Sequence, residues 1–200
     1  GVISNGTTLL DAGALDSGVA TGAMVLLSTA TASSSATIDF TSGIDSTYKE
    51  YIFKFIDIHQ ATDAADFQFQ VDTGTNTNYN QTITSSGLAA FNQEDDSARS
   101  VGAHTGSAVL HQEGVFQDLG RSLGNDNDQS LSGQLHLYEP SSATFVKHFI
   151  SNVNYHHPNV ASKQQFVAGY FNITTAITRV QFKFSSGNID SGVIKLYGVS

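Results

Sequence analysis

Apolar and polar residues alternate along much of this chain with a period of two, which is typical of a half-buried β-strand. The alternation is clearest near the C-terminus, where segments 180–185 and 194–197 place large apolar side chains between polar or amphipathic ones. The link 186–192 contains only Ser, Gly, Asn, Asp and one Ile, a composition that suits a hairpin turn. These features predict two strands joined in a hairpin by a tight turn.

Similar signals recur along the chain and together indicate about nine strands, while no stretch keeps a helical period for more than about two turns. Short spacing between strands, with turn residues in the gaps, predicts an all-β fold, and specifically a single antiparallel β-sandwich of jelly-roll type over residues 24–200. We therefore expect more than about 40% strand and less than about 10% α-helix. The expected strands are 24–30, 36–40, 51–58, 67–71, 131–138, 145–154, 165–171, 177–185 and 193–199.

The alternation also predicts which side chains face the core, because residues two apart lie on the same face of a strand. The predicted core residues are Phe53, Phe55, Phe69, Leu135, Leu137, Phe182, Phe184, Ile194 and Leu196. One turn sequence occurs twice, as FTSGIDS at 40–46 and FSSGNIDS at 184–191. We interpret the repeat as the same turn chemistry used at two places, since nothing else indicates a duplicated domain.

Residues 1–23 differ from the rest of the chain, because they are rich in small residues and contain no aromatic residue. Their apolar residues are too sparse among glycines to hold a helix or a strand alone. We interpret the segment as an extended N-terminal arm that becomes ordered on a neighbouring subunit, and a disordered leader is the alternative. The apolar residues assigned to this assembly arm are Ile3, Leu9, Leu10, Leu15 and Val19.

Residues 73–128 are more polar and alternate weakly, which predicts long loops with one or two irregular strands. Long loops on a rigid sandwich often carry binding residues. The Asn-rich run 76–80 holds Asn78 and Tyr79, which could contact a sugar by hydrogen bonding and ring stacking if exposed. The same composition is also typical of an ordinary loop.

The run Asn125–Asp128 resembles a fragment of a calcium-binding loop. An EF-hand loop counted from Asp126 requires Gly at its sixth position and Glu at its twelfth, but Leu131 and Leu137 stand there. An EF-hand is therefore excluded. Asp126 and Asp128 remain either loop contacts, including ligands of an adventitious calcium site in the loop, or part of a solvated turn.

Composition excludes several classes of partner. The chain has 200 residues, a net charge of −9 and no cysteine, so neither a disulfide nor a thiolate metal site can form. Such an acidic surface argues against binding to nucleic acid and to anionic membranes, where Lys and Arg supply the affinity. An uninterrupted apolar run of about 18 residues, which a membrane-spanning helix needs, is absent.

The residues show no convincing active site. There is no Gly-x-Ser-x-Gly elbow and no glycine-rich phosphate loop. His156 and His157 are adjacent and would face opposite ways on a strand, while His136 and His148 are interpreted as a packed or surface pair on neighbouring strands. Nothing in the sequence sets the separation of carboxylates for sugar hydrolysis, which could come from Glu94, Asp95, Asp96, Glu113 or Asp118.

A string of motifs runs along the chain. The motifs are DFTSGIDSTY (39–48), YIFKF (51–55), GND (124–126), SLSG (130–133), LHLYEPSS (135–142) and SGNIDSGVIKLYG (186–198). Together they resemble a group of virion structural proteins from marine bacteriophages, of tail-fibre or capsid-surface type, mostly from environmental phage genomes. The resemblance covers residues 24–199 and implies a β-rich fold and a place in the virion. It supplies no catalytic or binding residues.

The residues and the resemblance together predict a non-enzymatic virion protein, a surface subunit that decorates the capsid or forms part of an appendage. The expected partners are other virion proteins and further copies of this chain, with a trimer as the first choice. The alternative is a carbohydrate-binding module of a phage tail fibre that recognises host glycans, and a third hypothesis is a polysaccharide-degrading enzyme. We expect no cofactor, metal ion, nucleic acid or membrane among its partners.

Overall fold

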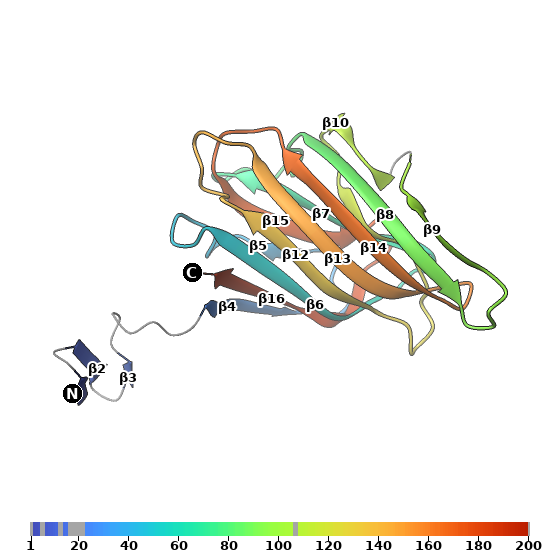
Figure 1. Cartoon of the computed structure of the whole chain (residues 1–200), viewed down its shortest axis with the longest axis horizontal. Coiled ribbons are helices and arrows are strands. Elements are labelled where there is room, and N and C mark those ends of the chain that lie inside the picture. The colour runs from blue at the N-terminus through green and yellow to red at the C-terminus, as the bar shows by residue number, and fades with distance from the viewer. Residues whose placement is uncertain (1, 5–6, 12–13, 16–22, 106–107, 200) are drawn as a thin grey trace.

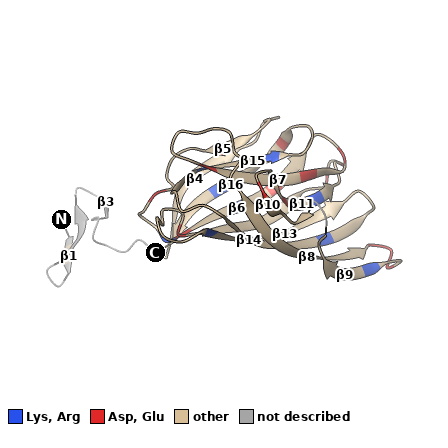
Figure 2. Ribbon diagram, turned by 90° about the horizontal axis from the view of Figure 1, so that it is seen from above, with Lys and Arg blue, Asp and Glu red and all other residues tan. Residues whose placement is uncertain are grey.

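The computed structural model describes residues 2–4, 7–11, 14–15, 23–105 and 108–199. Strands make up 61% of the chain, and no α-helix occurs in these ranges. Two antiparallel sheets form the body, as Figure 1 shows, so the predicted all-β antiparallel sandwich is confirmed. Lys and Arg are spread over several strands of the body rather than gathered in one place (Figure 2). Among the residues that the structure describes, no helix is long and apolar enough to cross a membrane.

The larger sheet has nine strands in the order β10-β8-β14-β13-β12-β6-β16-β4, and β9 also pairs with β8. Because β4 ends this order, one of its edges pairs with no other described strand. The strands are β4 (Met24–Thr31), β6 (Glu50–Gln60), β8 (Ile83–Gln93), β9 (Arg99–Ala103), β10 (His111–Glu113), β12 (Leu131–Tyr138), β13 (Lys147–His157), β14 (Ala161–Phe171) and β16 (Ile189–Val199).

The smaller sheet has the order β11-β7-β15-β5. Its strands are β5 (Ile38–Phe40), β7 (Ala65–Thr73), β11 (Gln117–Leu123) and β15 (Ile177–Phe184). The chain crosses repeatedly between the two sheets, and its strands pair as nested partners: β4 with β16, β5 with β15, β6 with β12, and β7 with β11. Early and late parts of the chain are therefore side by side in both sheets.

The predicted C-terminal hairpin is wrong. β15 belongs to the smaller sheet and β16 to the larger one, so the turn between them reverses the chain without pairing the two strands. Gly187 in this turn has a φ of 71°, and Gly43 in the similar link between β5 and β6 has a φ of 81°. Both values lie in the left-handed region that favours glycine. The repeated turn sequence therefore serves twice as a crossover from the smaller sheet to the larger one.

Segment 73–128 is more regular than its composition predicts, because β8, β9, β10 and β11 all lie within it. β8 alone is 11 residues long and is paired with β14 along its whole length. Its sequence, ITSSGLAAFNQ, alternates weakly because small residues occupy both faces. Backbone pairing with β14 therefore defines this strand more than its own pattern does.

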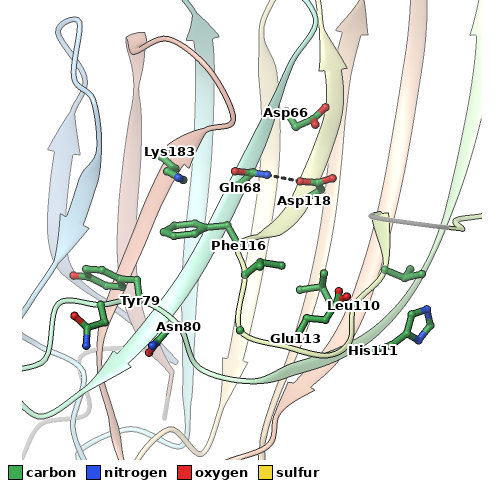
Figure 3. A pocket seen from close by; sticks show the side chains of 14 residues that line it. Asp66, Gln68, Tyr79, Asn80, Leu110, His111, Glu113, Phe116, Asp118 and Lys183 are labelled. Carbon is green, nitrogen blue, oxygen red and sulfur yellow. Dashed lines mark hydrogen bonds between the residues drawn. The ribbon is translucent and has the colours of Figure 1, made fainter.

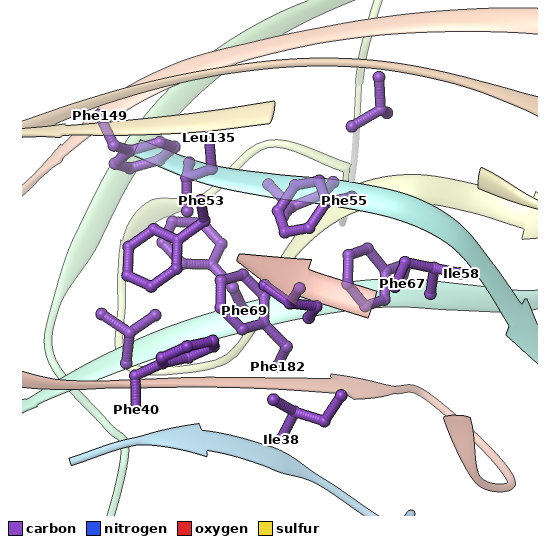
Figure 4. Close-up of a cluster of buried hydrophobic side chains, with 14 of the residues drawn as sticks. Ile38, Phe40, Phe53, Phe55, Ile58, Phe67, Phe69, Leu135, Phe149 and Phe182 are labelled. Atoms are coloured by element: carbon purple, nitrogen blue, oxygen red, sulfur yellow. The ribbon is translucent and has the colours of Figure 1, made fainter. Parts of the chain in front are cut away.

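The core lies between the two sheets and is rich in phenylalanine (Figure 4). Phe53 and Phe55 project from β6 in the larger sheet, and Phe67 projects from β7 in the smaller one. The ring of Phe182, on β15, contacts all three with centroid separations of 5.2, 5.3 and 5.9 Å. All nine predicted core residues are buried, so the assignment of faces from the alternation is confirmed.

The N-terminal segment differs from the expected strandless arm. β1 (Val2–Ser4), β2 (Thr7–Asp11) and β3 (Ala14–Leu15) pair with one another as a small antiparallel sheet, which pairs with neither sheet of the body. Antiparallel strands such as these can form backbone hydrogen bonds with each other without a large apolar face. Of the assigned arm residues, Ile3 is exposed, Leu9 and Leu10 belong to β2, Leu15 belongs to β3, and Val19 lies outside the described residues. Docking of this segment on a neighbour stays a prediction.

Candidate functional site

A hollow with a volume of about 1090 Å³ lies on the outer face of the smaller sheet (Figure 3). Its floor is made by outward-facing side chains of β7, β11 and β15. Residues 78–80 and 109–116, from two connecting segments, form its walls. The sheet face that alternation alone would expose to solvent is thus partly covered.

Two buried glutamines hold the covering segments in place. Gln70 Nε2 donates to the carbonyl oxygens of Gln81, at 3.0 Å, and Val115, at 2.8 Å. Gln117 Nε2 donates to the carbonyl oxygen of Ala108 at 3.0 Å. Because each amide satisfies backbone groups that would otherwise be buried without partners, these bonds fix the shape of the hollow.

Asp118 is the most perturbed acid in the hollow. Its Oδ1 accepts a hydrogen bond of 2.7 Å from Gln68 Nε2, and its Oδ2 lies 3.4 Å from Nε of Arg121. Burial raises the pKa of Asp118 to about 6, and the charge of Asp66 adds to the rise, while Gln68 and Arg121 oppose it. A carboxyl group that titrates near neutral pH can donate or accept a proton.

A cation and an aromatic ring stand together on the same floor. Nζ of Lys183 lies 4.2 Å from the ring centroid of Phe116, a cation–π contact. Glu113, at the end of β10, also lines the hollow, as Figure 3 shows. Within the described ranges, no second carboxylate is hydrogen-bonded to Asp118. The arrangement offers charge and hydrogen bonds to a polar ligand but shows no assembled pair of acid and nucleophile.

Asn78 and Tyr79, two of the predicted loop contacts, both line this hollow. Asn78 is exposed, but Tyr79 is only 6% exposed and its hydroxyl donates to Asp39 Oδ1 at 2.9 Å. Burial raises the pKa of Tyr79 to about 12, and the bond to Asp39 adds to this rise. The expectation of an exposed tyrosine that stacks on sugars is therefore wrong, since a φ of 46° turns this residue into the protein.

Asp126 and Asp128 lie elsewhere and are exposed. Asp128 lines a separate hollow of about 480 Å³, which shares no residue with the first. Asp126 Oδ2 accepts a hydrogen bond of 3.3 Å from Gln129 Nε2, which closes a local turn. In the part of the chain that the structure describes, no group of three or more His, Asp or Glu is placed to hold a metal ion. The two pairs of predicted contacts do not form one site.

His136 and His148 do not pair with each other, although β12 and β13 are neighbours. His136 stands opposite Ile150 and its Nδ1 bonds to Glu50 on β6. The His148 ring packs edge-on against Tyr170 on β14, with centroids 6.0 Å apart. Their expected pairing is wrong because the residue opposite His136 is Ile150, which lies two residues beyond His148 along β13.

Sequence reasoning missed Asp66, Gln68, Phe116 and Lys183 as residues of the hollow. Alternation does place Gln68 and Lys183 on the outer face of their strands. It gives no sign that distant connecting segments cover that face. Comparison with protein-family models, with curated proteins and with solved structures gave no match to this chain.

Proposed function

We propose that this chain is a non-enzymatic structural protein of a bacteriophage virion, a surface subunit that decorates the capsid or forms part of an appendage. The observation that carries the proposal is the strand order of the sandwich. We number eight strands of the sandwich from 1 to 8 in chain order: β4, β5, β6, β7, β11, β12, β15 and β16. In the larger sheet these strands lie side by side in the order 1-8-3-6, and in the smaller sheet in the order 2-7-4-5.

This order supports a jelly roll, in which four nested strand pairs roll into two facing sheets. Jelly rolls are common in viral capsid proteins and in lectins, although a fold alone does not fix a function. The resemblance of segment 24–199 to marine bacteriophage virion proteins favours the capsid or appendage role over other uses of the fold. β8, β9, β10, β13 and β14 widen one sheet beyond the eight strands.

The N-terminal segment and β4 support assembly with neighbouring subunits. β4 exposes Met24 and Leu26 and has one edge without a partner among the described strands. An uncharged apolar edge strand is a template for pairing with another chain. We propose that the segment before β4 docks on a neighbour, either a copy of this chain in a trimer or another virion protein of capsid or tail.

The test is to locate the chain in purified virions of the phage that encodes it. Mass spectrometry should find the chain in washed particles, and gold-labelled antibodies should mark the particle surface at regular positions. Recovery of the chain only from the soluble fraction of the lysate would remove the virion proposal.

Deleting residues 1–20 is expected to abolish incorporation into particles and leave the sandwich folded. The sandwich should stay folded because the described strands of this segment, β1 to β3, pair with neither sheet of the body. Thermal unfolding followed by circular dichroism checks the fold, and quantitative immunoblotting of purified virions checks occupancy. Asn78→Ala, a change in an exposed loop, should load normally. Wild-type occupancy of the truncated chain would assign attachment to the sandwich itself.

The purified protein is expected to cleave no polysaccharide, ester or peptide, because no acid and nucleophile are assembled among the described residues. Reducing-end assays on a panel of polysaccharides test this expectation. Cleavage that disappears in both Glu113→Gln and Asp118→Asn would instead support the hydrolase hypothesis, since both side chains line the same hollow.

A further inference from the structure

The outer face of the larger sheet carries a regular array of uncharged polar and aromatic side chains on three adjacent strands. We call this array the amide track. Cross-strand partners form its first three rows, and the last row extends the same register. The rows are Ser132, Asn154 and Gln164; Gln134, Asn152 and Phe166; His136, Ile150 and Ala168; and Tyr138, His148 and Tyr170.

One end of the track is a hollow of about 410 Å³ lined largely by amide side chains. Gln164 Nε2 donates to Asn152 Oδ1 at 3.2 Å, and Asn154 Nδ2 donates to Ser162 Oγ and to the carbonyl oxygen of Lys163, both at 3.1 Å. These bonds orient the amides. They leave the Asn152 NH₂ as a donor, and the oxygens of Asn154 and Gln164 as acceptors, toward the hollow.

The other end is a hollow of about 360 Å³ with aromatic walls. Tyr138, His148 and Tyr170 line it, and His136 stacks on Tyr138 with centroids 6.1 Å apart. Between the two ends, Phe166 is 38% exposed beside the amides. Amphipathic rings of this kind offer an apolar face together with a polar edge.

We propose that the amide track binds a neutral polysaccharide chain that lies along β13. An amide presents a donor and an acceptor in one plane, which matches two adjacent sugar hydroxyls, and an exposed ring packs on the C–H face of a pyranose. From His148 to Asn154 the track spans about 20 Å at ~3.3 Å per residue, enough for several sugar units.

Charge favours a neutral ligand over an anionic one. None of the twelve side chains of the track is Asp, Glu, Lys or Arg. Two charged residues of opposite sign, Lys54 and Glu50, stand at its rim on β6, where Glu50 bonds to His136. The chain as a whole carries a net charge of −9, which repels carboxylated or sulfated polymers. This site stands on its own geometry and does not depend on the virion proposal.

The test is affinity electrophoresis of the full chain in native gels cast with a galactomannan, a mixed-linkage β-glucan or, as the anionic comparison, polygalacturonate. At least one neutral polymer should retard the protein and polygalacturonate should not. The double variant Asn152→Ala with Gln164→Ala should bind about tenfold more weakly, because it removes two of the amides that would hydrogen-bond to sugar hydroxyls. Phe166→Ala, which removes the exposed ring, tests the stacking contact separately.

Asn127→Ala, a change in an exposed turn, is the matched control and should migrate as the parent does. Asn78→Ala, which changes the hollow on the other sheet, tests that hollow as the rival binding site. Thermal unfolding confirms that each variant is folded. Equal retardation of parent and track variants, or retardation lost only in Asn78→Ala, would overturn the proposal. So would failure of both neutral polymers to retard the parent. A dimer in light scattering that Ile150→Glu dissociates would show instead that the face joins two copies of the chain.

Discussion

Replacing Phe182 with alanine is expected to lower the free energy of unfolding by about 3–5 kcal/mol, which is typical for removing a fully buried phenylalanine. Phe182 is 0% exposed and stands at the middle of the core. Its ring packs edge-on against Phe53 and Phe55 from the opposite sheet and lies nearly parallel to Phe67. No single neighbour can fill the space it would leave, because close-packed interiors relax only partly.

Equilibrium unfolding in urea measures this loss. Phe145→Ala is the matched control, because that phenylalanine is 70% exposed and its removal should change the free energy of unfolding by less than about 0.5 kcal/mol. If Phe182→Ala unfolds at the same urea concentration as the parent, Phe182 does not link the two sheets as described.

Asp118→Asn is expected to stabilise the protein at pH 7.5 by about 3 kcal/mol and to change its stability little near pH 3.5. Burial raises the pKa of Asp118 from 3.8 to about 6, so the folded state binds this proton more tightly than the unfolded chain does. The parent therefore loses stability as pH rises from about 4 through 6, and a neutral amide removes that loss. The side chain is only 5% exposed, so solvent screens the effect weakly.

Urea unfolding of parent and variant at half-unit steps from pH 3.5 to 8 measures the difference. Asn127→Ala, which changes a side chain that does not titrate in an exposed turn, should give a difference that stays flat across this range. A flat difference for Asp118→Asn as well would show that this carboxyl group is solvated in the native protein.

Outside residues 1–23 and segment 73–128, alternation in the sequence predicted the strands and the buried face of each, and the core residues confirm the faces. Such a pattern is local, since side chains two apart must share a face whatever the strand pairs with. The turn at 185–188 shows where local information ends. Its residues predict a reversal of the chain, and the reversal occurs. They do not show whether the flanking strands pair with each other, and in the structure β15 and β16 lie in opposite sheets.

Burial of polar groups depends instead on contacts between distant segments. Lys147 is completely buried, and its Nζ donates to the carbonyl oxygens of Phe145, at 2.9 Å, and Ile173, at 3.2 Å. Alternation places Lys147 on the same face as Phe149 and Val153, but nothing near it in the sequence identifies the groups that satisfy its ammonium. Its environment exists only once the segments after β12 and β14 meet.

The hollow on the smaller sheet and the amide track on the larger one also depend partly on the local sequence and partly on contacts between distant segments. Outward-facing positions such as Gln68, Gln134 and Asn152 can be assigned from the period of two alone. Which of them is covered, and which stands beside another in a row, depends on strand pairing across tens of residues. The register of β12, β13 and β14 makes the amide track, and the segments that cross the smaller sheet bury Asp118. The local sequence decides which side chain stands at a position and which face of the strand it occupies. How far that side chain is desolvated, and which side chains lie beside it, depends on how remote strands pack together.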